Sequence, residues 1–241
     1  MLTKNTIKQV ASLRQQKFRK ELGLFVVEGR KMTEELLHSN FAVEAIYTTE
    51  ASHDLFPQAA TVTEVQMAQM SGQDTPPGIL AVVKIPDAQR FPQSSKFILA
   101  LDGVSNPGNM GTIIRTAEWF GIRDIVCSPD CVEVWNPKVI QATMGSIFRT
   151  NILETNLTDF LMEQQRADKA IYGALLEGKN LFEMNGCKDG VIVIGSESHG
   201  IREEVLPYIT HPVTIPRVGA SQTESLNASI AAAIIMAELT R

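Results

Sequence analysis

Short apolar runs alternate with helix-like stripes of apolar residues along the first 85 residues. Between residues 4 and 20, an apolar stripe with cations between its members predicts one helix, closed by Gly23. The same pattern predicts further elements in this part: strands at 24–27, 42–48 and 78–84, a helix at 31–37, and a strand-to-helix passage at 62–70. Such alternation is typical of a compact α/β domain.

The stretch from 86 to 95 contains two prolines and two serines, and its composition predicts a linker. We therefore expect two domains, at 1–85 and 96–241. Beyond the linker, apolar runs predict strands that alternate with helices, near 97–101, 124–127, 150–154, 170–175, 191–195 and 213–215. This order predicts an α/β domain with a mainly parallel sheet that is covered on both faces.

Composition narrows the class of protein. The chain has 241 residues, of which 44% are hydrophobic and 20% charged, as in an ordinary globular protein. No apolar run reaches the roughly 18 residues of a membrane span, and the polar start lacks a signal-peptide core, so we expect a cytoplasmic protein. Cys127, Cys131 and Cys187 are an odd number without zinc-type spacing, which predicts reduced thiols and no metal.

Charge is distributed unevenly. The net charge is −5, yet residues 1–31 carry eight Lys or Arg side chains against two Glu. A local basic face matters more than net charge for contact with phosphates, so this part is a candidate nucleic-acid surface. The alternative is a solvated helix face with clustered like charges.

The stretch from 99 to 122, LALDGVSNPGNMGTIIRTAEWFGI, combines an apolar run, a Gly-rich loop and the start of a helix. This order presents backbone N–H groups and the positive end of a helix dipole to an anion or a nucleotide. Asn109 lies at the helix entrance, and Arg115 lies among apolar residues more than one turn inside. Arg115 therefore needs a partner, either a structural carboxylate or a substrate phosphate. The glycine spacing lacks the P-loop lysine and the dinucleotide fingerprint, which argues against NTP or NAD binding and a nucleotide-dependent oxidoreductase.

Two later segments have a similar organisation. Residues 191–201, VIVIGSESHGI, run from a buried-type strand into a turn that contains Glu197, which could instead cap a helix beginning near 201. In 215–233, a loop leads to Ser225 and Asn227 at the start of a helix of small residues. Ser and Asn are also good helix caps, and a capping role is compatible with a functional role for the same residues.

Together these three segments resemble the three sequence motifs of the SpoU (TrmH) branch of the SPOUT methyltransferases, over residues 97 to 241. The N-terminal part resembles the RNA substrate-binding domain of that family, which has a ribosomal-protein-like fold. General folding rules predict an unknotted sheet, whereas the resemblance implies a deep trefoil knot. It also implies S-adenosylmethionine as cofactor and transfer of its methyl group to a ribose 2′-hydroxyl of RNA, with 23S ribosomal RNA favoured over tRNA.

The resemblance assigns roles to particular residues. The catalytic set is Asn109, Arg115, Glu197, Ser225 and Asn227. The cofactor-binding set is Thr143, Met144, Gly145, Gly195, Ile215 and Leu226, although Met144 could equally fill a core. The RNA-binding set, taken from the basic N-terminal segment, is Lys8, Arg14, Lys17, Arg19, Lys20 and Arg30.

Two further expectations concern assembly and activity. The helix from 227 to 239 is apolar almost all round, which predicts burial on several faces and, with the resemblance, a homodimer. The alternative is that this helix is central within its own monomer. A non-catalytic RNA-binding protein of the same fold would be indicated by loss of Asn109, Arg115 or Glu197, and all three are present.

Overall fold

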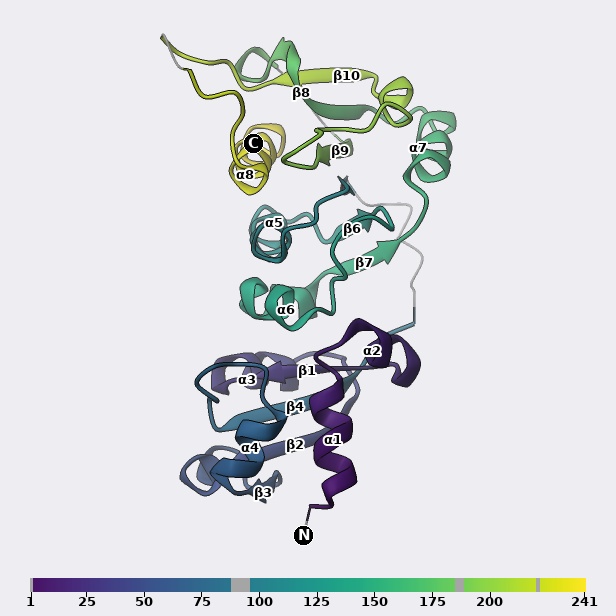
Figure 1. Ribbon diagram of the computed structural model, residues 1–241. Coiled ribbons are helices and arrows are strands. Elements are labelled where there is room, and N and C mark those ends of the chain that lie inside the picture. Colours follow the sequence, from purple (N-terminus) through teal and green to yellow (C-terminus); the bar gives the residue numbers. More distant parts are fainter. Residues whose placement is uncertain (1, 88–95, 185–188, 220–221) are drawn as a thin grey trace. The chain divides into compact units, whose positions relative to one another are not determined.

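The computed structural model describes residues 2–87, 96–184, 189–219 and 222–241 (Figure 1). Contacts divide the chain into two compact units, Met1–Asp87 with Glu133–Phe148, and Ala88–Val132 with Arg149–Arg241. Most of the expected linker, from residue 88 to 95, lies outside the described residues, as does Cys187. The expected domain boundaries stay a prediction, and the packing adds that residues 133–148 contact the first unit.

The first unit is built on a four-stranded sheet in the order β1-β4-β2-β3. β4 lies antiparallel to both β1 and β2, and β3 lies parallel to β2. Its strands are β1 (Leu24–Glu28), β2 (Val43–Thr49), β3 (Ala60–Val62) and β4 (Ile79–Lys84). Its helical elements are α1 (Lys4–Ser12), α2 (Gln16–Leu22), α3 (Arg30–Leu37), η1 (Glu50–Leu55), α4 (Glu64–Met70) and α6 (Pro137–Thr143), followed by η2 (Ser146–Arg149).

The prediction of one helix over 4–20 was wrong, because the chain forms two helices with a break at 13–15. The guanidinium of Arg19 donates a hydrogen bond to the carbonyl of Leu13 at 2.7 Å. A carbonyl used in this way favours a break in the helical ladder at that point. Gly23 does end the second helix, in the left-handed conformation with φ 64°, as the sequence predicts.

Two clusters of buried side chains hold the first unit together. One joins α1 and α4 to the sheet through Val10, Leu13, Met67 and Leu80. The other is aromatic and includes residues of the later segment: the rings of Phe25 and Trp135 lie 4.9 Å apart, those of Phe41 and Phe148 5.3 Å apart. Segment 133–148 is thus packed into the first unit by ring contacts of the kind that stabilise cores.

The second unit is a six-stranded sheet in the order β10-β8-β9-β5-β6-β7, with every neighbouring pair parallel. Its strands are β5 (Phe97–Asp102), β6 (Asp124–Cys127), β7 (Asn151–Glu154), β8 (Ile171–Asn180), β9 (Gly190–Gly195) and β10 (His211–Thr214). Its helical elements are α5 (Pro107–Trp119), α7 (Leu157–Arg166), η3 (Leu181–Glu183), η4 (Leu206–Tyr208) and α8 (Ala228–Leu239). The α/β class with a mainly parallel sheet is confirmed, whereas the trefoil knot stays a prediction.

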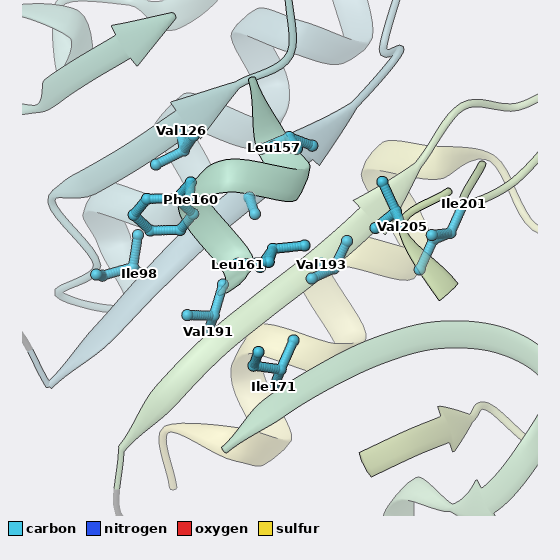
Figure 2. Close-up of a cluster of buried hydrophobic side chains, with 11 residues drawn as sticks. Ile98, Val126, Leu157, Phe160, Leu161, Ile171, Val191, Val193, Ile201 and Val205 are labelled. Carbon is cyan, nitrogen blue, oxygen red and sulfur yellow. The ribbon is translucent and has the colours of Figure 1, made fainter. Parts of the chain in front are cut away.

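Both faces of this sheet are covered. Phe160 and Leu161 of α7 pack against alternate sheet residues such as Ile98 and Val193 (Figure 2). Because side chains alternate across a strand, the equally buried Leu99 points to the other face. α5 and α8 pack against each other and lie on the opposite side of the sheet from α7 (Figure 1). Among the described residues, the helices all fall short of the length and apolarity that crossing a membrane requires.

Candidate active site

The candidate site lies where the chain changes the side of the sheet on which it adds strands. β5 continues through β6 to β7 on one side, whereas β9 lies on its other side and comes later in the chain. Asp102 and Gly195, the last residues of β5 and β9, are register partners. The loops that follow the two strands therefore start side by side, at the kind of switch point where open α/β sheets bind ligands.

The first of these loops ends in a well-defined helix start. Gly103 turns the chain with φ 68°, a value that favours glycine. The side chain of Asn106 then caps α5 by accepting a hydrogen bond from the backbone N–H of Asn109 at 3.0 Å. Pro107 stands at the first helical position, where its missing N–H costs nothing. This local chemistry fixes Asn109 on the first turn of α5, as the sequence predicts.

Asn109 joins the three motif segments. Its side-chain amide donates a hydrogen bond to the Oε1 of Glu197, and its Oδ1 accepts one from the Nδ2 of Asn227 at 3.1 Å. The Oδ1 of Asn227 accepts from the backbone N–H groups of Ser229 at 2.9 Å and Ile230 at 3.3 Å. We call Glu197, Asn109 and Asn227 the amide relay. Because a carboxylate only accepts and backbone N–H groups only donate, the two ends fix which way both amides point.

The turn that carries Glu197 is tightly closed. Ser196 and Gly200 exchange two backbone hydrogen bonds of 3.0 Å. A Cβ on Gly195 would lie 2.1 Å from the carbonyl carbon of Gly200, so the residue must be glycine for the turn to fold back. Glycine is thus required at 195 because the backbone of Gly200 and Ile201 passes too close to leave room for a Cβ.

No helix begins at 201, because residues 203–205 form a turn and the short η4 begins only at Leu206. The interpretation of Glu197 as a helix cap was therefore wrong. Its carboxylate accepts the amide of Asn109 instead, and the side chain remains exposed to solvent. His199 in the same turn is also exposed and lies beside the hydroxyl of Ser198 at 2.8 Å.

Arg115 is not brought into the amide relay. It is exposed on α5, six residues after Asn109, which places it about 240° further round the helix and about 9 Å along it. Among the described residues it makes no hydrogen bond or ion pair, and the carboxylate of Glu197 accepts the amide of Asn109 instead. Of the two partners expected from the sequence, a structural carboxylate is not found there, and a phosphate remains.

The third motif divides into two kinds of residue. Asn227 is the cap of α8 and also a member of the amide relay. Ser225 is exposed and makes no hydrogen bond among the described residues, and Leu226 is 46% exposed. Ile215, just after β10, is half-buried. Leu226 and Ile215 therefore leave apolar surface uncovered in the second unit.

The remaining cofactor candidates lie in the first unit, at the end of α6. Thr143 is buried and donates its hydroxyl to the carbonyl of Ile140 at 2.7 Å. Met144 has φ 50° and Gly145 φ 97°, so the helix ends in a left-handed turn. Met144 is 36% exposed, which contradicts its interpretation as core filler. A Cβ on Gly145 would lie 2.9 Å from the Cγ of Glu35.

The predicted RNA-binding cations differ in their availability. Arg19 is buried and was wrongly assigned: its guanidinium pairs with the carboxylate of Glu133 and bonds the carbonyl of Leu13, because a buried charge requires such partners. Arg30 is exposed and pairs with Glu34 one turn later. The other four candidates are exposed to solvent, namely Lys8, Arg14, Lys17 and Lys20.

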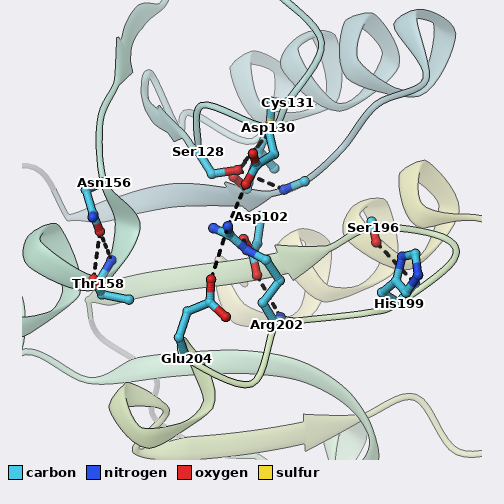
Figure 3. A network of polar contacts seen from close by, with 12 residues as sticks. Asp102, Ser128, Asp130, Cys131, Asn156, Thr158, Ser196, His199, Arg202 and Glu204 are labelled. Atoms are coloured by element: carbon cyan, nitrogen blue, oxygen red, sulfur yellow. Dashed lines mark hydrogen bonds and ion pairs between the residues drawn. The ribbon is translucent and has the colours of Figure 1, made fainter.

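Sequence reasoning missed an ionic network beside the amide relay (Figure 3). The carboxylate of Asp102 is fully buried and accepts from the backbone N–H of Arg202 at 2.8 Å and from its Nε at 2.6 Å. The Nη1 of Arg202 contacts Asp130 at 2.5 Å and Glu204 at 3.2 Å. The one signal in the sequence was Asp102 at the end of an apolar run, because a carboxylate that is buried there needs a cationic partner.

Two cysteines lie near the end of β6: Cys127 is its last residue, and Cys131 lies in the loop that follows. A hydrogen bond from the thiol of Cys127 lowers the pKa of Cys131 to about 7, against the opposing effect of burial. The same bond, together with complete burial, raises the pKa of Cys127 well above its ordinary value. Both are free thiols. In the part of the chain that the structure describes, no group of His, Cys, Asp and Glu residues is arranged to hold a metal ion.

The parallel sheet, its switch-point loops and the amide relay define an α/β protein with a candidate ligand site at the carboxyl ends of β5 and β9. The SpoU rRNA Methylase family model matches residues 96–237, and the MRM3-like substrate binding domain model matches residues 4–81. The chain belongs to the SpoU rRNA methylase family.

Relatives and solved structures agree with this membership. The chain is 28% identical to the 23S rRNA (guanosine(2553)-2′-O)-methyltransferase RlmP of Bacillus subtilis, over 97% of this chain and 95% of that protein. A putative RNA methyltransferase of the TrmH family from Porphyromonas gingivalis is 36% identical, with a TM-score of 0.90 over 99% and 98% of the two chains. An AdoMet-bound rRNA methyltransferase from Sinorhizobium meliloti is 26% identical, with a TM-score of 0.87 over 99% and 95%.

Proposed function

We propose that this protein transfers a methyl group from S-adenosylmethionine to a ribose 2′-hydroxyl of 23S ribosomal RNA, in the cytoplasm. The observation that carries the proposal is the amide relay, which joins three separate segments at the switch point of the sheet. Relatives named as 23S rRNA 2′-O-methyltransferases support the substrate class over tRNA. The alternative of a non-catalytic RNA-binding protein does not explain why an exposed carboxylate and two amides are held in one fixed arrangement.

The uncovered apolar surface of Ile215 and Leu226 fits the adenosine part of the cofactor, because a purine ring is bound in sites with apolar walls and a few backbone polar groups. Gly195 is proposed to supply a backbone contact to the cofactor within the second unit, and the assignment of Thr143, Met144 and Gly145 in the first unit stays a prediction. Bound there, the cofactor supplies an activated sulfonium methyl group. The protein's task is then to hold the 2′-oxygen in line with that group, and such positioning lowers barriers by up to about 7–11 kcal/mol.

Arg115 is proposed to act as a cation. Deprotonating an arginine at pH 7 from a pKa of about 12.5 costs about 7.5 kcal/mol, which makes it a poor general base. A charged guanidinium that has no ion pair among the described residues instead suits the phosphate of the target nucleotide and the negative charge that develops on the 2′-oxygen. The amide relay would orient the ribose beside it, with Ser225 as a further hydrogen-bonding group.

Two measurements test the enzymatic proposal. Maps of 2′-O-methylation in cellular RNA, with and without the gene, should differ at a position in 23S rRNA. A change in tRNA alone would mean that the protein is a tRNA 2′-O-methyltransferase. No change would favour the hypothesis of a non-catalytic RNA-binding protein.

With the purified protein, Arg115→Ala should lower methyl transfer by roughly 10²–10³-fold while cofactor affinity changes less than a few-fold. Arg166→Ala is a matched control, since Arg166 is exposed at the end of α7 on the other face of the sheet. Near-normal turnover by Arg115→Ala on its true RNA would refute the assignment.

We further propose that the protein works as a homodimer through α8. The face of this helix opposite its buried residues carries Ile230, Ala233, Ile234 and Ala237, of which Ile230 is 51% exposed. An apolar stripe of this kind is most simply covered by a second copy related by two-fold symmetry. Sedimentation at micromolar concentration should therefore give twice the 26.5 kDa chain mass. An active species at the chain mass would refute the dimer.

A further inference from the structure

We propose that Arg202 is a positioning residue for the reaction: by tying the end of the 196–200 turn to the buried carboxylate of Asp102, it holds Glu197 where the amide of Asn109 reaches it. This inference rests on the proposed function for its kinetic consequences. Its structural claim, that the Arg202–Asp102 pair sets the geometry of the amide relay, is independent of the substrate.

The pair is required by burial. Asp102 has no exposed surface, and a carboxylate removed from water must be compensated by donors. Among the described residues, both donors to this carboxylate come from Arg202: its backbone N–H to Oδ2 and its Nε to Oδ1. The two bonds run from one residue to the two oxygens of one carboxylate, so they fix the backbone of Arg202 as well as its side chain.

The position of Arg202 in the chain makes this fixation relevant to Glu197. The turn leaves the sheet at Gly195, which is the register partner of Asp102, and it returns through Gly200 to Arg202. Its outgoing end is held by strand pairing and its returning end by the carboxylate of Asp102 (Figure 3). Glu197 lies between these two anchors. Both anchors are fixed to the same part of the sheet, because Asp102 and Gly195 are register partners on the adjacent strands β5 and β9.

The contacts of Arg202 with Asp130 and Glu204 contribute less than its contact with Asp102. Asp130 and Glu204 are 62% and 58% exposed in their side chains, and ion pairs with exposed acids contribute little. Burial opposes the charge of Arg202, but the three carboxylates outweigh it and raise its pKa. Arg202 therefore stays charged at every pH of interest, and the buried contact with Asp102 is the one that positions the turn.

The structural claim is tested on the full-length protein by the ¹⁵N–¹H signals of the Asn109 side-chain amide, assigned with an Asn109→Asp variant. Arg202→Gln and the milder Arg202→Lys should both shift these signals, because lysine keeps the charge but has no Nε donor at that place. Glu203→Gln is the matched control, since Glu203 is the exposed neighbour of Arg202 and makes no side-chain hydrogen bond or ion pair among the described residues. Unchanged Asn109 signals in both Arg202 variants would overturn the proposal.

The kinetic claim is tested by a double-mutant cycle with Glu197→Ala, which removes the acceptor of the Asn109 amide. We expect Arg202→Lys to lower kcat by about 10- to 100-fold in the natural sequence, the range that small misplacements cause, with RNA KM changed less than threefold. In the Glu197→Ala background it should lower kcat less than twofold, while the loss in Tm is equal in both backgrounds. An equal loss of kcat in both backgrounds would mean that Arg202 acts independently of Glu197, which would overturn the inference.

Failure of this inference and failure of the proposed function give different results. If the natural protein methylates no RNA, the proposed function fails and the Asn109 signals still decide the structural claim. If Arg202→Gln does not fold, Arg202→Lys carries both measurements, and Asp130→Asn, which removes only an exposed partner, should leave kcat within twofold.

Discussion

Asn227 has two tasks in the structure, and substitutions can separate them. Its Oδ1 caps α8 through the N–H groups of Ser229 and Ile230, whereas its Nδ2 donates to Asn109. Asn227→Ala removes both tasks. Asn227→Asp keeps two acceptor oxygens at the positive end of the helix dipole but has no donor for Asn109. Stability and activity should therefore respond differently to the two changes.

The magnitudes follow from the contacts. Loss of an asparagine cap costs about 1 kcal/mol, which for a chain of this size lowers Tm by roughly 2–4 °C in Asn227→Ala. Asn227→Asp should lower Tm less than Asn227→Ala does, because aspartate is an equally good cap and only the hydrogen bond to Asn109 is lost. Loss of one neutral hydrogen bond of about 1 kcal/mol corresponds to roughly fivefold in rate, and a larger displacement of the Asn109 amide to as much as about 100-fold.

Asn227→Asp should be the more damaging change for activity. With carboxylates at both 197 and 227, the single amide group of Asn109 faces two acceptors and can donate toward only one of them. We expect kcat to fall by about 5- to 100-fold in both variants, measured as methyl transfer to the target RNA, with Tm measured on the same samples by calorimetry. Full kcat in Asn227→Asp would refute the amide relay, as would a loss of kcat that follows the loss of Tm.

Three further predictions test other parts of the molecule. Arg19→Met should lower the free energy of unfolding in urea by about 3–5 kcal/mol, because it leaves the buried carboxylate of Glu133 without its partner. Adding Glu133→Leu should recover most of this loss. A cost below about 1 kcal/mol for Arg19→Met alone would contradict the burial of the pair. Alkylation of Cys131 by iodoacetamide, followed by peptide mass spectrometry, should rise with a midpoint at about pH 7, since only the thiolate reacts. Cys127→Ala removes the thiol donor and should move that midpoint upward, and an unchanged midpoint would contradict the cause given for the shift. Lys17→Glu should weaken RNA binding and reduce its dependence on salt, with each lost phosphate contact lowering the log–log slope by roughly 0.7–0.9; an affinity insensitive to salt would contradict the basic surface.

Local patterns in the sequence predicted most of the second unit. All six strands of its sheet overlap the apolar runs that predict them, although β8 continues to Asn180. The reason is clearest for β5, β6 and β9, because parallel strands buried on both faces are nearly continuous apolar segments. Asn109 and Asn227 were assigned to helix starts, since Asn106, Pro107 and Asn227 itself are local signals. These features depend on a few neighbouring residues, and a single sequence contains that information.

The errors share a different cause, which is partners far apart in the chain. Arg19 was assigned to RNA because its charge is visible in the sequence, but Glu133 lies 114 positions away and only the fold brings it close. Arg202 and Asp102 are separated by 100 positions, so their pairing was equally hidden. The sequence shows that a buried charge will need a partner, but it does not show which residue that partner is.

Glu197 and Arg115 have different surroundings in the structure. The carboxylate of Glu197 accepts the amide of Asn109. Arg115 lies about 240° further round α5 than Asn109 and is exposed, with no ion pair among the described residues. In water an unpaired guanidinium costs little, whereas one already neutralised by glutamate would have to exchange that partner before binding a phosphate. Under the proposed function, the amide relay would orient the ribose, while Arg115, which makes no ion pair among the described residues, would be available for the negative charge of RNA.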